Sequence, residues 1–152
     1  MSRNFVCTIV AAFFVLTAAI PALAAPNSAD ACSLLSQAQV SAAVGKQVGA
    51  GAWVTPSFTA TCTWTAPGVI VTVMTEGVDK YQAGKTPLSP AMQIVPASGI
   101  GDDAYYVVSG TIVMLYTKKG NVAFKTSIYS KLPIDTLKKM ESTLASQVAS
   151  EL

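Results

Sequence analysis

The N-terminal segment constrains the fold most, because it decides how much chain is left to fold and in which compartment. A positively charged start is followed by an apolar run over residues 5–20, and small residues then place two alanines in an A-x-A arrangement. This layout is typical of a secretory signal peptide over residues 1–24, cleaved after Ala24. The remaining residues, 25–152, have a length typical of one domain, which we expect to be ordered from about residue 31.

Two other interpretations of this segment are open. An uncleaved membrane anchor would need about 20 apolar residues to span the bilayer, and this run has about 16. A lipoprotein would need a cysteine directly after the cleavage site, whereas Cys32 lies farther along, behind the acidic Asp30. We therefore expect a periplasmic or secreted protein without a stable membrane anchor after cleavage.

The cysteines give the next constraint. Cys7 leaves with the signal peptide, so the mature chain has only Cys32 and Cys62. Two cysteines in an oxidising compartment favour a disulfide over two buried free thiols. Closing about 30 residues of chain should stabilise the fold by about 3 to 4 kcal/mol in the chain-entropy account.

The mature composition excludes several classes of function. The mature chain has nine lysines and eight acidic residues, but no histidine and no arginine. The one arginine of the sequence, Arg3, lies in the signal peptide. The lysines occur at most in pairs, so they form no basic patch for nucleic acid. No guanidinium is present for bidentate binding of phosphate or carboxylate. Because histidine is absent and both cysteines are paired, we expect no transition-metal site and no cofactor.

The helices are indicated at the two ends of the mature chain. Ser36 and Gln39 form the pattern of a capping box, and Gly45 can end the short helix that they begin. Near the C-terminus, apolar residues recur every three or four positions, which predicts a helix with polar residues on the opposite, solvent side. The stripe comprises Leu137, Met140, Leu144 and Val148, and the solvent side comprises Lys138, Lys139, Glu141 and Ser142.

The strands are indicated between these helices. Residues 61–65 and 69–75 predict a hairpin, and residues 104–108, 111–117 and 122–129 predict three consecutive antiparallel strands. Residues 76–101 are a long irregular connection with room for a helical turn at 78–83. We therefore predict an α+β domain with an antiparallel sheet of about five strands, a short N-terminal helix and an amphipathic C-terminal helix packed on one face.

Three short motifs resemble those of a known group of proteins. They are C-S-L-L at Cys32–Leu35, C-x-W at Cys62–Trp64 and G-x-G-D-x-A at Gly99–Ala104. Together they resemble small exported bacterial proteins of unknown function, many of them lipoproteins. The resemblance implies a disulfide that ties the first helix to an early strand, in a domain where helices lie on a sheet. This chain departs from many such proteins because it lacks the lipidated cysteine.

Candidate site residues cluster after the irregular segment. Asp102 and Asp103 are adjacent carboxylates, but neighbours on an extended chain face opposite sides, so a local turn is favoured over acid–base or cation chemistry. Tyr105 and Tyr106 also face opposite sides, and one of them is expected to be exposed. These four residues, beside residues 76–101, form the candidate binding surface.

The sequence favours a non-catalytic binding or interaction module of the cell envelope. Its partner would be an envelope protein or a small ligand, and nucleic acid is not expected. The alternative is a small hydrolase or transferase that uses Ser, Lys or Asp without histidine or metal.

Overall fold

The computed structural model describes residues 30–152, so the predicted signal peptide lies outside the described residues. A seven-stranded antiparallel sheet is accompanied by one 3-10 turn and three α-helices in this part of the chain. The strands are β1 (Ala52–Trp53), β2 (Thr61–Ala66), β3 (Val69–Gly77), β4 (Met92–Ala97), β5 (Asp103–Ser109), β6 (Ile112–Lys119) and β7 (Val122–Tyr129). The helical elements are η1 (Ala31–Ser33), α1 (Gln37–Val44), α2 (Val78–Ala83) and α3 (Ile134–Glu151). The α+β class is confirmed.

The prediction of about five strands is wrong, because β1 and β4 add to the sheet. β4 lies within the segment that we expected to be irregular, and it contains Pro96. Proline cannot donate to a ladder and is tolerated on an edge strand, and β4 is the edge next to β5. β1 forms the other edge with only two residues, which is too short to give a periodic signal.

The strand order is β1-β2-β3-β7-β6-β5-β4. The predicted hairpin is β2 with β3, and the predicted meander is β5, β6 and β7. A long ladder between β3 and β7 joins the two units, with a register that runs from Ile70 opposite Tyr129 to Gly77 opposite Val122. The last strand of the chain is therefore central in the sheet.

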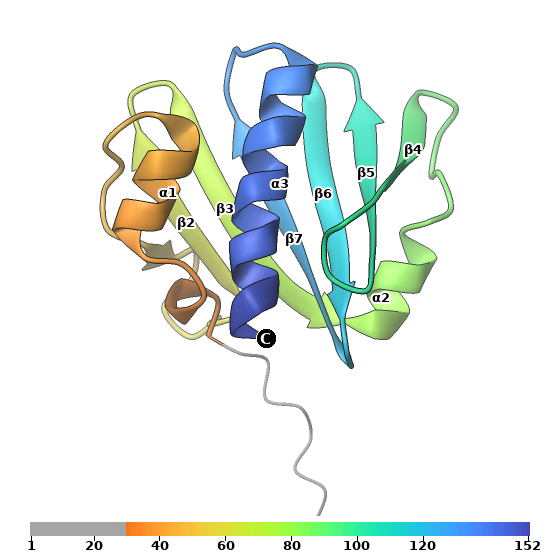
Figure 1. The fold of residues 1–152 in the computed structure, drawn as a ribbon, viewed down its shortest axis with the longest axis horizontal. Coiled ribbons are helices and arrows are strands. Elements are labelled where there is room, and N and C mark those ends of the chain that lie inside the picture. The colour runs from red at the N-terminus through yellow and green to blue at the C-terminus, as the bar shows by residue number, and fades with distance from the viewer. Residues whose placement is uncertain (1–29) are drawn as a thin grey trace, which may run out of the picture.

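Helices cover both faces of the sheet unequally. Figure 1 shows α1 and α3 lying across one face, where α3 contacts β6 and β7. The main core lies beneath them and includes Trp64, Leu115, Phe124, Leu137 and Leu144. α2 packs on the opposite face, where its Tyr81 forms a smaller cluster with Tyr105, Val107 and Ala123. Between residues 30 and 152, no helix is both long enough and apolar enough to cross a membrane.

The predicted start and end of α1 are confirmed. The Ser36 hydroxyl accepts a hydrogen bond from the Gln39 backbone N–H at 3.2 Å, and the Gln39 side chain accepts one from the Ser36 N–H at 2.8 Å. Gly45 then ends the helix in the left-handed conformation, at φ 66°. These contacts satisfy backbone groups that the helix itself leaves unpaired.

The predicted disulfide is confirmed between Cys32 and Cys62, whose Cα atoms are 4.9 Å apart. It joins η1 to β2, and Trp64, two residues farther along β2, is buried in the core. Asp30 strengthens this corner, since its Oδ1 accepts hydrogen bonds from the Cys32 N–H and from the Trp53 indole N–H, both at 2.9 Å. The N-terminal part of the domain is therefore fixed to the first two strands.

Candidate functional site

Asp102 has a structural role at the turn between β6 and β7. Its Oδ2 accepts a hydrogen bond from the Gly120 N–H at 2.7 Å, and the Lys118 and Lys119 amines lie 3.9 and 3.6 Å from its carboxylate oxygens. The Gly120 N–H, followed by the two lysines, lowers the pKa of Asp102 below its ordinary value. The carboxylate therefore stays ionised and holds the turn.

Asp103 is engaged elsewhere, at the start of β5. Its Oδ2 lies 2.5 Å from the Lys85 amine, and this contact lowers the pKa of the Asp103 carboxyl. The two adjacent aspartates thus bind different partners, as their opposite directions on an extended chain predict. Within residues 30–152, no group of three or more His, Cys, Asp or Glu side chains is placed to hold a metal ion.

The expectation that Tyr105 or Tyr106 is exposed is wrong. Tyr105 is 3% and Tyr106 is 8% exposed, because helices cover both faces of β5. The Tyr105 hydroxyl donates to the Tyr81 carbonyl at 2.7 Å, and its ring stacks on Tyr116 with centroids 5.1 Å apart. The Tyr106 hydroxyl donates to the Lys138 carbonyl at 3.1 Å. Both tyrosines pack helices onto the sheet and offer no exposed aromatic surface.

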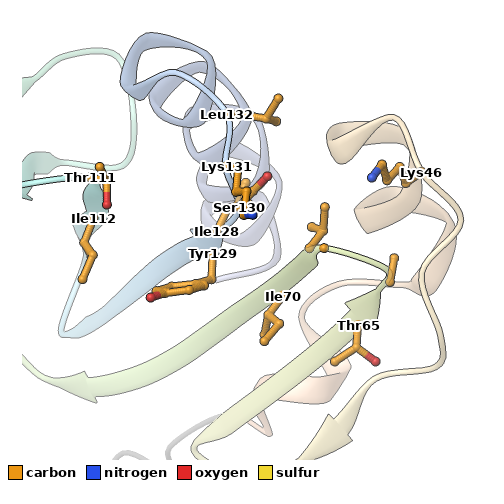
Figure 2. A pocket seen from close by; sticks show the side chains of 13 residues that line it. Lys46, Thr65, Ile70, Thr111, Ile112, Ile128, Tyr129, Ser130, Lys131 and Leu132 are labelled. Atoms are coloured by element: carbon orange, nitrogen blue, oxygen red, sulfur yellow. The ribbon is translucent and has the colours of Figure 1, made fainter.

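An open groove lies instead at the end of the sheet where the β2–β3 turn, the start of β6 and the end of β7 meet (Figure 2). We call it the sheet-end groove, and its volume is about 1070 Å³. A second hollow, beside α2 and β4, has only about 190 Å³. The apolar lining of the sheet-end groove includes Ile70, Ile112, Ile128, Tyr129 and Leu132.

Four of these apolar side chains are unusually exposed. Ile70, Ile112 and Leu132 are 44%, 42% and 41% exposed, and Tyr129 is 67% exposed. Single exposed apolar residues are ordinary, but a group gathered around one concavity is typical of a contact surface. Ile128 and Tyr129 are neighbours on a strand and face opposite sides of the sheet, yet both line the groove. The groove therefore extends over the end of the sheet and reaches both faces.

The groove exists because β6 and β7 separate before either strand ends. Their ladder stops at Met114 opposite Ser127, whereas β6 continues to Ile112 on β5 and β7 continues to Tyr129 on β3. A separation of two paired strands would leave the Ile128 N–H without a ladder partner. This N–H instead donates to Oε1 of Glu141 at 2.9 Å.

Glu141 was expected on the solvent side of α3, and this expectation is wrong. Its side chain is fully buried, because its position four residues after Leu137 and three before Leu144 places it on the apolar stripe of the helix. Burial raises the pKa of the Glu141 carboxyl to about 8, and the hydrogen bond from Ile128 opposes this only in part. The Glu141 carboxyl group, whose raised pKa favours the neutral form, therefore replaces a strand partner where β6 and β7 separate.

The polar part of the lining is basic. Lys46 and Lys131 are the charged residues among those that line the groove, and no acidic residue joins them. The Lys46 amine donates to the Pro67 carbonyl at 3.2 Å. Neither lysine forms an ion pair within the described chain, where the ion-paired lysines are Lys85, Lys118 and Lys119.

The hydroxyl groups of the lining are separate from its two lysines. Thr65, Thr111 and Ser130 contribute hydroxyls, but across residues 30–152 no hydrogen bond joins any of them to Lys46 or Lys131. A serine activated by a lysine needs that contact. The groove thus offers an apolar surface, two cations and separate hydroxyls.

Comparison of the chain with protein-family models, with curated proteins and with solved structures finds no match.

Sequence reasoning missed the groove for a physical reason. Its residues come from four separate segments, which are Lys46 and residues 65–70, 111–112 and 128–132, and the strand order that brings the strand segments together cannot be deduced from strand patterns alone. One signal was available: Ile70, Ile112 and Tyr129 each occupy positions beside a turn, where a large apolar residue is not needed for the core.

Proposed function

We propose that the mature protein is an exported, non-catalytic binding module that holds a small, largely apolar ligand in the sheet-end groove. The observation that carries this proposal is the gathering of Ile70, Ile112, Tyr129 and Leu132, all partly exposed, around one concavity of about 1070 Å³. Ligand sites are typically concave, mostly apolar and about 300 to 1,000 Å³ in volume, with a few polar groups that fix orientation.

The structure of the groove supports a site that is formed before ligand binding. The Glu141 carboxyl group satisfies the Ile128 N–H where the strands separate, so β6 and β7 need not close to avoid an unpaired buried donor. A preformed site loses less entropy on binding than one that must be ordered by its ligand.

Export is the second part of the proposal. The Cys32–Cys62 disulfide is what an oxidising compartment allows, and it agrees with a periplasmic or secreted location. The resemblance to small exported bacterial proteins, drawn from the three sequence motifs, points the same way and also remains a proposal.

Binding is tested with N-phenyl-1-naphthylamine, a neutral apolar dye that becomes fluorescent in an apolar site. The wild-type protein is expected to bind the dye at a single class of site. Replacing Ile112 and Tyr129 together by serine should weaken binding by about tenfold or more, because both side chains lose apolar contact with the dye.

The control is Val54→Ser, which removes an exposed apolar side chain that does not line the groove. It should leave the dye affinity unchanged, and circular dichroism should show that all variants are folded. Equal affinities for the wild type and the Ile112→Ser, Tyr129→Ser double variant would contradict the proposed site.

A further inference from the structure

We infer that the ligand of the sheet-end groove is an anionic amphiphile, with an acyl chain on the apolar lining and a carboxylate or phosphate group at Lys46 and Lys131. This inference rests on the proposed function and names the class of ligand for the same groove. Two observations carry it: the sign of the charges at the groove, and the state of the strand edges.

The charge around the groove is one-sided. The mature chain has nearly equal numbers of lysines and acidic residues, yet the charged residues of the lining are Lys46 and Lys131 alone. Both side chains are exposed, and neither is neutralised by an ion pair within residues 30–152. An anion at either amine would gain a charge-assisted hydrogen bond without displacing a carboxylate.

The two lysines reach the groove from different elements than its apolar residues on β3 and β6. Lys46 follows α1 and Lys131 follows β7, while Ile70 on β3 and Ile112 on β6 lie on either side of β7 (Figure 2). An acyl chain gains about 0.8 kcal/mol for each methylene group that it buries. Lysine acts as a compact point charge rather than a planar fork, so both carboxylate and phosphate fit.

The strand edges argue against an extended peptide. A peptide that adds a strand needs free backbone donors on the edge that it joins. At the separation of β6 and β7, the Ile128 N–H is already bonded to the Glu141 carboxyl group. A strand added to β7 would find this donor already occupied, which favours an aliphatic ligand held by side chains.

The test compares decanoate with decanol, which have chains of similar length but differ in charge. Each compound, below its aggregation limit, competes with N-phenyl-1-naphthylamine, and decanoate binding is also measured directly by calorimetry. Decanoate should displace the dye at a concentration about tenfold lower than decanol. The Lys46→Gln, Lys131→Gln double variant should lose this preference while it still binds decanol and the dye.

The matched control is Lys139→Gln, since Lys139 is exposed on α3 and does not line the groove. It should keep the preference for decanoate. Equal displacement by decanoate and decanol, or an unchanged preference in the double variant, would overturn the inference and leave the proposed function intact. Failure of dye and decanoate alike to bind would overturn both.

A second arm identifies the source of the anion. Sedimentation with vesicles of phosphatidylglycerol, and of phosphatidylcholine as the uncharged control, should leave the protein in solution, because the apolar residues line a concavity and bind single molecules. Sedimentation with phosphatidylglycerol vesicles without calorimetric binding of decanoate would show that the surface binds a bilayer and would overturn the inference.

Discussion

The Glu141 carboxyl group on α3 accepts a hydrogen bond from the Ile128 backbone N–H on β7, at 2.9 Å, where β6 and β7 separate. A side chain of α3 thus supplies the hydrogen-bond acceptor that a neighbouring strand would otherwise provide. Ile128 also lines the sheet-end groove, so this contact fixes one residue of the proposed site.

Glu141 should make stability depend on pH. Burial raises its pKa in the folded protein from the model-compound value of 4.5 to about 8. Between these two values the unfolded chain loses a proton that the folded chain keeps, so the free energy of unfolding falls as pH rises from about 4.5 to about 8 and then levels off. The fall is at most about 1.4 kcal/mol per pH unit for this group.

Urea unfolding across this pH range measures the effect. Glu141→Gln should flatten most of the slope, because the amide keeps an acceptor for the Ile128 N–H but does not titrate. The exposed Glu151→Gln is the control and should keep the slope. A wild-type stability that is constant from pH 5 to pH 8 would show that Glu141 does not stay neutral in the folded protein.

The Cys32–Cys62 disulfide should contribute strongly to stability. Replacing both cysteines by serine should lower the free energy of unfolding by about 3 to 4 kcal/mol, because the unfolded chain regains the freedom of a loop that spans 30 residues of sequence separation. Thermal unfolding of the two proteins measures this. Intact mass after alkylation without reductant should show no modified thiol in the exported protein, and two modified thiols would disprove the bridge.

A side chain at Gly101 should lower the free energy of unfolding more than a side chain at Gly120. Both have φ 58°, which is unfavourable for alanine by about 1 to 2 kcal/mol. At Gly101 an added Cβ would also lie 2.5 Å from the Lys118 carbonyl oxygen, while at Gly120 it would meet nothing within 4 Å. Gly101→Ala should therefore be less stable than Gly120→Ala by about 1 to 3 kcal/mol, measured by urea unfolding. Equal losses would refute the close approach of Gly101 to β6.

Tyr105 should behave as a core residue. Tyr105→Phe removes the buried hydrogen bond to the Tyr81 carbonyl and should lower the free energy of unfolding by about 1 to 2 kcal/mol. Tyr129→Phe, at an exposed position, should change it by less than about 0.5 kcal/mol. Dye binding by folded Tyr105→Phe should match the wild type, and a selective loss of binding there would return the site to the Asp102–Tyr106 surface.

The predicted signal peptide has its own test. N-terminal sequencing of the exported protein should find Ala25 as the first residue, because the A-x-A arrangement places cleavage after Ala24. A mature protein that begins before Pro21, or one that stays in the membrane fraction, would contradict this prediction.

Local signals in the sequence predicted the local parts of the fold. Neighbouring residues specify the capping box at Ser36 and the strands of the hairpin and the meander. The even number of cysteines in the mature chain specifies the disulfide between Cys32 and Cys62. All of these are confirmed. The stripe on α3 was also evident, but Glu141 was assigned by its charge rather than by its position. Helical spacing from Leu137 and Leu144 would have placed it correctly.

The candidate site was not predictable in the same way. Exposure of Tyr105 depends on α2, and the groove depends on the β3–β7 ladder and on where β6 leaves β7. These are non-local pairings that leave no periodic pattern in the chain. Pro96 likewise concealed β4, because a proline argues against a strand unless that strand is known to be at an edge.

The most direct test of the central claim is an NMR titration of the protein with N-phenyl-1-naphthylamine, followed by backbone amide shifts. Binding in the sheet-end groove predicts that the largest shifts occur at Ile112 and at residues 128–132, while residues 102–106 change little. Largest shifts at residues 102–106, or no shifts at saturating dye, would contradict the claim that this groove is the binding site.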